Sequence, residues 1–198
     1  MTIAGIDVST AGQGTDFNWL PYRGRIGFAG IKITEGTGYA DPSAARNIAG
    51  ARSIGAVPIG YHFLHAGQDG ARQAEWFLSH AKAVGLRPGH IIAIDAEDGG
   101  LNGQLPAHMN VVAAAFAAEL RKHFGVAFNP VLYTELSMAP ALTALGHCPL
   151  WLANPSRVHT GAIGPWTGVS FEQTGQRGVD TDVFYGSDAA LAKLAIPR

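Results

Sequence analysis

The chain has 198 residues, of which 47% are hydrophobic and 15% are charged, a composition typical of a folded globular protein rather than a disordered one. Its formal net charge of −1 gives no electrostatic reason to expect nucleic acid or an anionic membrane surface as a partner. The single cysteine, Cys148, excludes an intrachain disulfide and a cysteine-based metal cluster, and we expect it to pack in the core.

The first ten residues, MTIAGIDVST, have neither the basic start nor the long apolar stretch of a secretion signal. No segment approaches the roughly 20 apolar residues that span a bilayer, so we expect no membrane insertion. The sequence therefore predicts a protein that is made in the cytoplasm. If it acts outside the cell, we expect it to be released by something other than its own leader.

Short apolar runs alternate with longer amphipathic ones along the chain. The apolar runs predict strands over 3–8, 27–33, 56–63, 90–95, 129–134, 149–153, 167–173 and 179–185. The amphipathic runs predict helices over 42–54, 69–84, 106–124, 135–145 and 187–194, and a glycine follows the end of each of the first four. The sequence contains no internal repeat and no low-complexity linker that would divide it.

The alternation of strands and helices through the first two thirds predicts βαβ units and a parallel sheet. Eight strands in one domain favour a closed α/β barrel related to the (β/α)8 type, with an open doubly wound sheet as the alternative. Between 153 and 167 the chain is rich in glycine and proline and has no helical period, and only TGQRG separates the last two strands. Because a parallel crossover needs more residues than that, we predict a single-domain, TIM-like barrel of the (βα)5β3 type that ends in an antiparallel hairpin.

Three carboxylates follow the fourth predicted strand, in the sequence IIAIDAEDGG. Asp95 and Glu97 are two residues apart, so they share a face of an extended chain, with α-carbons about 6–7 Å from each other. Repulsion between two such carboxylates raises one pKa and makes that group a plausible proton donor near neutral pH. Asp98 falls on the other face, where we expect it to serve a turn. Alone, this motif does not distinguish an active site from a solvated loop.

Further acids are predicted at the same end of the sheet. Asp7 ends the first strand, and Asp180 and Asp182 share a face at the start of the last strand. If the last strand runs backwards, its first residues meet the carboxyl ends of the other strands, where barrel enzymes place their active sites. An acidic pocket on a chain with so few charges is the pattern expected for glycoside hydrolysis.

Aromatic side chains near strand ends also suit a sugar. Tyr61 ends the third predicted strand, and Tyr133 and Trp151 lie near the ends of the fifth and sixth, although core packing explains Trp151 equally well. His62 and His65 suggest zinc, but they are three residues apart, and neither an H-E-x-x-H motif nor a cysteine ligand accompanies them. We therefore predict no metal and no cofactor.

The motifs GIDVS, IKITEGTGYADP, GYHF, IDAED, LYT, LWLA and VDTDVFYG occur in this order along the chain. In both content and order they resemble glycoside hydrolase family 25, and the resemblance covers essentially all of the sequence. The family contains the lysozymes, or N-acetylmuramidases, that are common among phage endolysins and bacterial autolysins. The resemblance implies that residues 1–198 form one catalytic domain of five βα units plus three strands. It also implies cleavage of the β-1,4 bond between N-acetylmuramic acid and N-acetylglucosamine in peptidoglycan.

The same resemblance implies roles for individual residues. Glu97 corresponds to the general acid, and Asp95 to the residue that orients the substrate N-acetyl group or stabilises a positive intermediate. Asp7 and Asp180 match the remaining catalytic acids. The residues expected to bind substrate are Glu35, Tyr61, Tyr133, Trp151, Gln173 and Asp182.

The chain departs from many relatives at two places. It has TAGQG at 10–14, where they have an aromatic stretch, and Glu172 before Gln173, where they have tryptophan. Both differences remove aromatic residues from the expected cleft, so the fine specificity for substrate is expected to differ. The acids are all present.

Several alternatives stay open at the level of sequence. The substrate's own N-acetyl oxygen could attack the anomeric carbon with help from Asp95, or Asp7 or Asp180 could activate a water for direct inversion. A metal-dependent peptidoglycan amidase and a non-catalytic wall-binding barrel are the other functions considered. For a muramidase, we expect a monomer that acts on peptidoglycan glycan strands. It would reach the wall as a phage endolysin does, after the membrane is permeabilised, or as the catalytic domain of a longer lysin.

Overall fold

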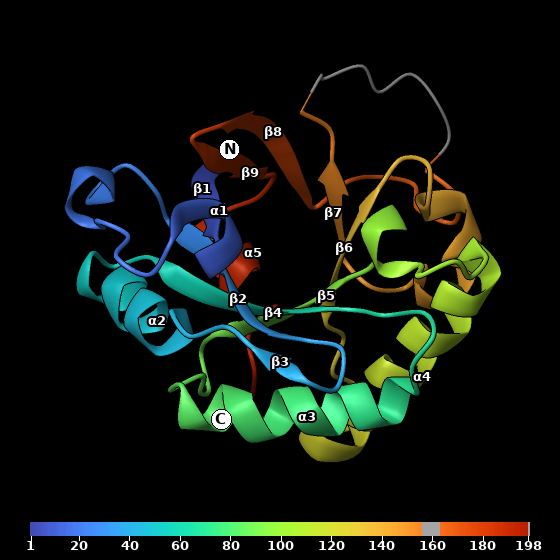
Figure 1. Cartoon of the computed structure of the whole chain (residues 1–198). Helices are drawn as coiled ribbons and strands as arrows, with labels where there is room; N and C mark the ends of the chain where they lie inside the picture. Colours follow the sequence, from blue (N-terminus) through green and yellow to red (C-terminus); the bar gives the residue numbers. More distant parts are fainter. Residues whose placement is uncertain (156–162, 198) are drawn as a thin grey trace.

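The computed structural model describes residues 1–155 and 163–197. Within these ranges the strands form a nine-stranded sheet in the order β1-β9-β8-β7-β6-β5-β4-β2-β3, and pairing of β1 with β2 closes it into a barrel (Figure 1). The strands are β1 (Ile3–Val8), β2 (Phe28–Glu35), β3 (Tyr39–Ala40), β4 (Val57–Phe63), β5 (Ile91–Asp95), β6 (Val131–Glu135), β7 (Leu150–Ala153), β8 (Phe171–Arg177) and β9 (Val179–Phe184). The predicted single-domain, TIM-like α/β barrel is confirmed.

The direction of the strands decides which ends meet. The pairs from β1 through β2, β4, β5, β6 and β7 to β8 are parallel. Only β9 among the barrel strands runs the other way, antiparallel to both β8 and β1. Its first residues therefore lie beside the carboxyl ends of its neighbours, as the predicted hairpin requires.

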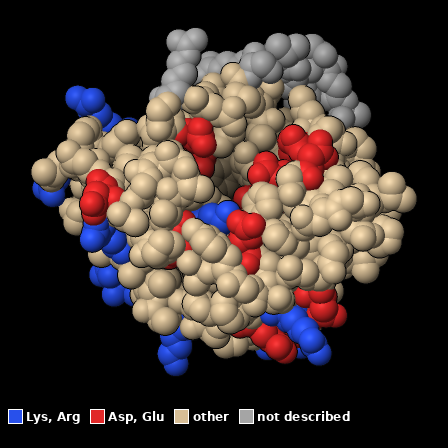
Figure 2. All heavy atoms as spheres, viewed as in Figure 1, with Lys and Arg blue, Asp and Glu red and all other residues tan. Residues whose placement is uncertain are grey.

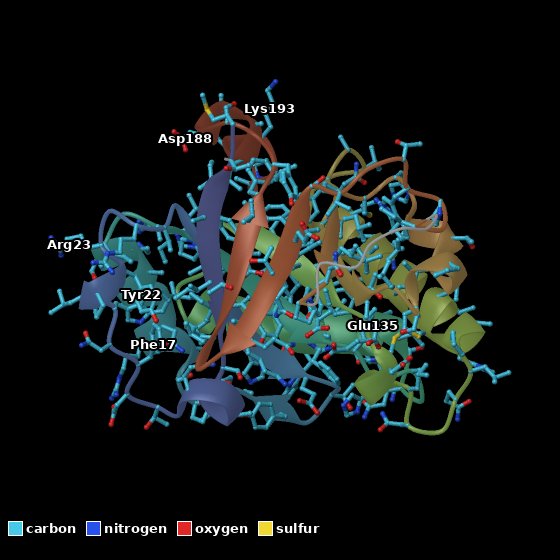
Figure 3. The ribbon with its side chains drawn as sticks, turned by 90° about the horizontal axis from the view of Figure 1, so that it is seen from above. Phe17, Tyr22, Arg23, Glu135, Asp188 and Lys193 are labelled. Atoms are coloured by element: carbon cyan, nitrogen blue, oxygen red, sulfur yellow. The ribbon has the colours of Figure 1, made fainter. Side chains whose placement is uncertain are left out.

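The longer helices cover the outside of the barrel, one short helix lies at the cavity, and another packs against the interior (Figure 1). They are α1 (Thr10–Gln13), α2 (Ala44–Ser53), α3 (Gly70–Ala83), α4 (Pro106–Phe124) and α5 (Asp188–Ala192), with 3₁₀ turns at Leu20–Tyr22, Asp98–Gly100, Ala139–Ala141 and Thr143–Leu145. Local signals set the helix ends: the Asp69 side chain accepts a hydrogen bond from Arg72 N at the start of α3, and Pro106 opens α4. Helix α5 begins at Asp188, which is labelled in Figure 3. Its residues Ala190 and Leu191 pack against the apolar interior of the barrel.

Alternation along the strands separates two apolar layers. In β5, Ile91 and Ala93 belong to the barrel interior, whereas Ile92 and Ile94 pack outward against the helices. Because side chains alternate with period two, Asp95 continues the inward-facing row. The strand thus delivers a carboxyl group to the interior at its carboxyl end.

The helix predicted over 135–145 is wrong. β6 extends to Glu135, and the following residues form the 3₁₀ turns Ala139–Ala141 and Thr143–Leu145. Pro140 explains the difference, because its ring has no N–H and clashes with the preceding helical turn.

The strand predicted over 167–173 begins later and runs further, from Phe171 to Arg177. The residues TGQR therefore belong to the sheet, and Gly178, with φ at 81°, makes the turn to β9. Residues 156–162, part of the predicted irregular segment, lie outside the described residues. The short elements β3 and α1 were not predicted, and no described helix is long and apolar enough to cross a membrane.

Candidate active site

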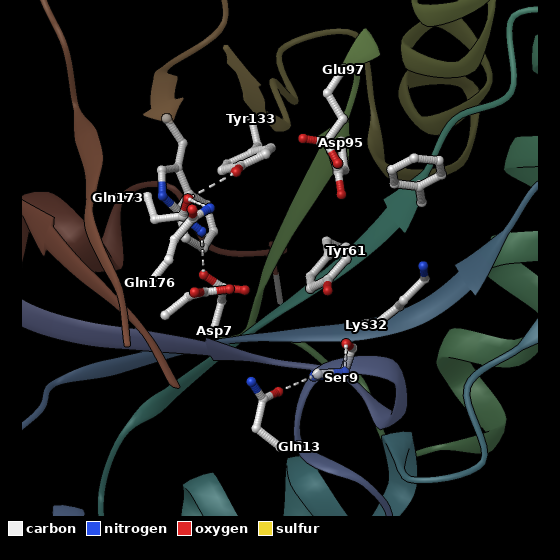
Figure 4. Close-up of a pocket in the computed structure, with 14 residues that line it drawn as sticks. Asp7, Ser9, Gln13, Lys32, Tyr61, Asp95, Glu97, Tyr133, Gln173 and Gln176 are labelled. Carbon is white, nitrogen blue, oxygen red and sulfur yellow. Dashed lines mark hydrogen bonds between the residues drawn. The ribbon is translucent and has the colours of Figure 1, made fainter. Parts of the chain in front are cut away.

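A cavity of about 250 Å³ opens at the carboxyl ends of the parallel strands. Acidic side chains gather around this hollow on the molecular surface, with basic atoms inside it (Figure 2). The predicted site residues that line it are Asp7, Tyr61, Asp95, Glu97, Tyr133, Trp151, Gln173 and Asp180 (Figure 4). Glu35 and Asp182 are not among its lining residues.

The chain stays extended beyond β5 and so places two carboxyl groups in the same cavity. Glu97 has φ −137° and ψ 170°, and both it and Asp95 line the cavity. Between them Ala96 is buried, and its N–H donates to Tyr133 O at 3.0 Å while its carbonyl accepts from Thr134 Oγ1 at 2.6 Å. Backbone pairing to β6 therefore continues the alternation that the sequence suggested.

Burial dominates the electrostatics of this pair. Asp95 is 7% exposed, and its Oδ1 has no hydrogen-bond partner among the described residues. Burial, and then repulsion from Glu97, raise the pKa of Asp95 well above its ordinary value. Burial also raises the pKa of Glu97, the charge of Glu135 on β6 raises it further, and the Lys32 ammonium opposes both. The pair therefore retains a proton at a pH where exposed carboxyl groups have lost theirs.

Strands β1 and β9 bring a second group of acids to the cavity. Asp7 lies directly opposite Asp180, and Asp182 lies two residues further along β9. Gln173 Nε2 donates to Asp7 Oδ2 at 2.9 Å, and Trp151 Nε1 donates to Asp182 Oδ1 at 2.9 Å. Burial raises the pKa of Asp7 to about 7, and repulsion from Asp180 adds to this, while the Gln173 hydrogen bond lowers it.

Asp182 lies beneath this group rather than on the cavity wall. It is 2% exposed, and its Oδ2 has no donor among the described residues. Burial, and then repulsion from Asp7, raise the pKa of Asp182 well above its ordinary value. Burial of the two neighbouring carboxyl groups therefore favours their protonated forms.

Aromatic residues form part of the cavity wall and its floor. Tyr133 donates its hydroxyl to Gln173 Oε1 at 3.2 Å, and its ring meets Trp151 edge-on with centroids 5.5 Å apart. Trp151 is 2% exposed, so it is a core residue that also lines the cavity. Gly30 makes this possible, because a Cβ there would lie 2.7 Å from Trp151 Cη2 and 2.8 Å from Asp7 Cβ.

Two irregularities in strand pairing bring further polar side chains to the cavity. The register of β8 shifts after Gln173, so Gln173 and Gln176 both line the cavity although they are three residues apart. The register of β2 shifts after Lys32, and Lys32 Nζ reaches Glu35 Oε2 at 2.6 Å across the same interval. Glu35 does not line the cavity itself, but it binds Lys32, which does.

The two histidines that suggested zinc point to different partners. His62 is buried, hydrogen-bonds to Thr34 Oγ1 at 2.8 Å, and has its pKa lowered to about 3 by burial. His65 Nε2 instead binds Glu35 Oε1 at 2.9 Å. Among the described residues, no group of three or more histidine, cysteine, aspartate or glutamate side chains could hold a metal ion. Cys148 is buried, and burial raises the pKa of its thiol to about 11.

Several residues of the site were not singled out from the sequence. The additional lining residues are Ser9, Gly12, Gln13, Lys32, Phe63 and Gln176. Three of them lie at or in α1, whose start is marked by Ser9 Oγ accepting a hydrogen bond from Gly12 N. A serine in an N-cap position directly after a strand is a recognisable signal, and it would have placed a short helix at the cavity rim.

Comparisons with known proteins identify the family of this chain. The sequence profile of Glycosyl hydrolases family 25 matches residues 6–182. The N,O-diacetylmuramidase of Chalaropsis sp is 31% identical over 215 residues, which cover 98% of this chain and 99% of the relative. A family 25 lysozyme from Aspergillus fumigatus has a similar structure, with a TM-score of 0.80, 26% identity, and coverage of 98% of this chain and 99% of that one. The CTP1L endolysin shares the fold, with a TM-score of 0.71, 22% identity, and coverage of 98% of this chain and 68% of that one.

The profile match spans nearly the whole barrel, from the strand that carries Asp7 to the strand that carries Asp180. The relative above 30% identity aligns along its full length and is a muramidase by name. The chain therefore belongs to glycosyl hydrolase family 25, and it is a lysozyme that hydrolyses bacterial peptidoglycan as a muramidase.

Proposed function

We propose that Glu97 is the general acid that protonates the glycosidic oxygen between N-acetylmuramic acid and N-acetylglucosamine, and that Asp95 is its partner. The observation that carries this proposal is the shared cavity in which burial keeps a proton on the pair. In the empty cavity the more deeply buried Asp95 competes for that proton. A substrate N–H that donates to Asp95 favours its charged form, so the proton moves to Glu97 beside the leaving oxygen.

The substrate's N-acetyl oxygen attacks the anomeric carbon in this mechanism, and Asp95 orients the acetamido group. The support is the Asp95 Oδ1 atom, a buried acceptor without a donor among the described residues, which suits an amide N–H. The competing route is inversion, with Asp7 or Asp180 activating a water. Proton NMR of the first product separates the two: we expect the β-anomer, and initial release of the α-anomer would contradict substrate assistance.

Replacing Glu97 tests the assignment of the acid. Glu97→Gln keeps the shape of the side chain but cannot donate the proton, so release of reducing ends from peptidoglycan should fall by about 10²–10⁴-fold. The far-UV circular dichroism spectrum and melting temperature should stay close to those of the wild type. Glu75→Gln, on the exposed face of α3, is the matched control and should retain full activity. A Glu97→Gln enzyme with near-normal rates would contradict the proposal.

The other predicted residues divide into those that meet the sugar and those that support them. Tyr61, Tyr133 and Gln173 line the cavity and contact the glycan, and Trp151 forms the floor. Asp180 and Asp7 supply the carboxyl groups on the β1 and β9 side of the cavity. Asp182 affects the site through its repulsion with Asp7, and Glu35 affects it through its ion pair with Lys32.

The catalytic unit in this proposal is the whole chain, residues 1–198, acting as a monomer. The support is that one chain contributes both the acid pair and the opposing Asp7 and Asp180. Size-exclusion chromatography with light scattering should give the mass of one chain at the concentrations used for assays. A stable dimer would contradict this point and leave the catalytic assignment in place.

The proposed route to the wall is that of an endolysin, and the support is the fold shared with the CTP1L endolysin. Cells that express the chain should stay intact until chloroform permeabilises the membrane, and should then lyse quickly. Appearance of the active enzyme in the medium without permeabilisation would contradict this route.

A further inference from the structure

Glu135, labelled in Figure 3, is the last residue of β6. It is not among the residues that line the cavity. Its Oε1 accepts a hydrogen bond from the backbone N–H of Asp98 at 2.7 Å. Asp98 directly follows Glu97, so this contact holds the peptide unit at the carboxyl side of the proposed acid. Glu135 of β6 is thus hydrogen-bonded, from outside the cavity, to the segment that carries the acid.

The contact completes a row of hydrogen bonds between β6 and residues 96–98. The parallel pairing of β5 with β6 ends at Asp95 opposite Tyr133. Beyond it, Ala96 N donates to Tyr133 O, and Thr134 Oγ1 donates to Ala96 O. Glu135 supplies the next contact in the row, after the strand pairing has ended.

Charged groups from several strands surround the Glu97 carboxyl group. They are Glu135 on β6, Lys32 on β2, Asp7 on β1, Asp180 on β9, and Asp95 and Asp98 on its own segment. Among the charges, Glu135 has the largest effect on the pKa of Glu97, and it raises that pKa, whereas Lys32 lowers it. The geometry and the charge of Glu135 therefore act on the same residue.

We propose that Glu135 is a positioning residue for the acid, which fixes the backbone between Glu97 and Asp98 and places a negative charge that favours the protonated Glu97. The proposal rests on the proposed role of Glu97. Two separable functions follow from it. The hydrogen bond sets the direction of the acid, and the charge sets the pH range over which the acid carries its proton.

Two variants separate these functions. Glu135→Gln removes the charge and keeps an Oε1 acceptor for Asp98 N, whereas Glu135→Ala removes both. The measurement is the pH dependence of kcat and kcat/KM on soluble, uncrosslinked peptidoglycan strands at constant ionic strength. Glu75→Gln removes the same charge from the exposed face of α3 and is the control, with no expected change in either profile.

The negative charge of Glu135 predicts a shift in the alkaline limb of the pH profile. Because the enzyme is active with Glu97 protonated, loss of the neighbouring negative charge should move that limb to lower pH in Glu135→Gln, by about half a pH unit for one partly screened charge. The kcat on the acidic plateau should stay at the wild-type value. Glu135→Ala should show the same shift and also a several-fold lower plateau kcat, with little change in KM.

The outcomes discriminate between this proposal and the one on which it rests. A Glu135→Gln profile that coincides with the wild type overturns the electrostatic role, and a wild-type plateau kcat in Glu135→Ala overturns the backbone role. Glu97→Gln is assayed in parallel. If that variant is inactive and Glu135→Gln is unshifted, only the role of Glu135 fails; if Glu97→Gln stays active, the acid assignment fails and this proposal with it.

Discussion

A single buried residue, Asp182, shows how the acids of this site depend on one another. It accepts a hydrogen bond from Trp151, and burial together with repulsion from Asp7 raises its pKa. Asp182→Asn keeps an acceptor for Trp151 and removes the repulsion with Asp7, so we expect a melting temperature at pH 8 equal to or above that of the wild type. Asp182→Ala leaves the buried Trp151 N–H without an acceptor and should cost about 1–3 kcal/mol.

Thermal melts followed by circular dichroism at pH 8 check this order. Both variants remove the same charge, so each serves as the control for the other, and their difference isolates the hydrogen bond from Trp151. If Asp182→Asn melts as low as Asp182→Ala, then the hydrogen bond from Trp151 is not what Asp182 contributes to stability.

At the scale of elements, strand periodicity predicted the acids but not the polar residues around them. Asp95 and Glu97 reach one cavity because extended chain alternates with period two, and the antiparallel last strand brings Asp180 to Asp7. Gln176 and Lys32 reach it near bulges, which shift the pairing register and leave no pattern in one sequence.

Glu135 was missed for a different reason. The segment that begins with it was predicted as a helix, whereas β6 includes Glu135 as its last residue. Local pattern rules place strand ends poorly, and a residue that acts from a strand end is lost when the end is misplaced. Asp182 was predicted to bind substrate, but it does not line the cavity, and its position next to Trp151 of β7 and Asp7 of β1 is one that no local pattern records.

At Gly30, strand β2 lies very close to side chains of the barrel interior, and this packing can be tested. In Gly30→Ala the new Cβ meets both Trp151 and Asp7 closer than 3.0 Å, so the sheet or the indole must move. Overpacking of this kind costs about 1–3 kcal/mol, and displacement of the cavity floor should also lower kcat. Urea unfolding and the rate of reducing-end release are the measurements.

Gly38→Ala is the matched control for this variant. Gly38 lies in the turn between β2 and β3, has no atom within 4 Å of a new Cβ and has no positive φ. It should therefore keep the stability and the activity of the wild type. Equal losses in the two variants would mean that the packing at Gly30 does not support the cavity.

At the scale of the whole molecule, folding buries several carboxyl groups, and burial favours their protonated form over their charged form. Burial raises the pKa values of Asp7, Asp95 and Asp182, while few basic side chains enter the cavity to offset their charge. Lys32 is the lining residue that does so, and it is already paired with Glu35. The free energy of unfolding should therefore fall as the pH rises, because of carboxyl groups in the active site itself.

For Asp7 the sign and the window follow from the values. Its pKa rises from an ordinary 3.8 to about 7 on folding, so the folded state binds the proton more tightly than the unfolded chain. The resulting stabilisation is complete below the unfolded value, declines as the pH rises, and is lost once the pH passes about 7. Asp7→Asn removes this titration, so its melting temperature should fall less than that of the wild type between about pH 4 and pH 7. Glu75→Gln should follow the wild-type curve, and an Asp7→Asn curve parallel to it would show that the buried carboxyl group does not set the pH dependence of stability.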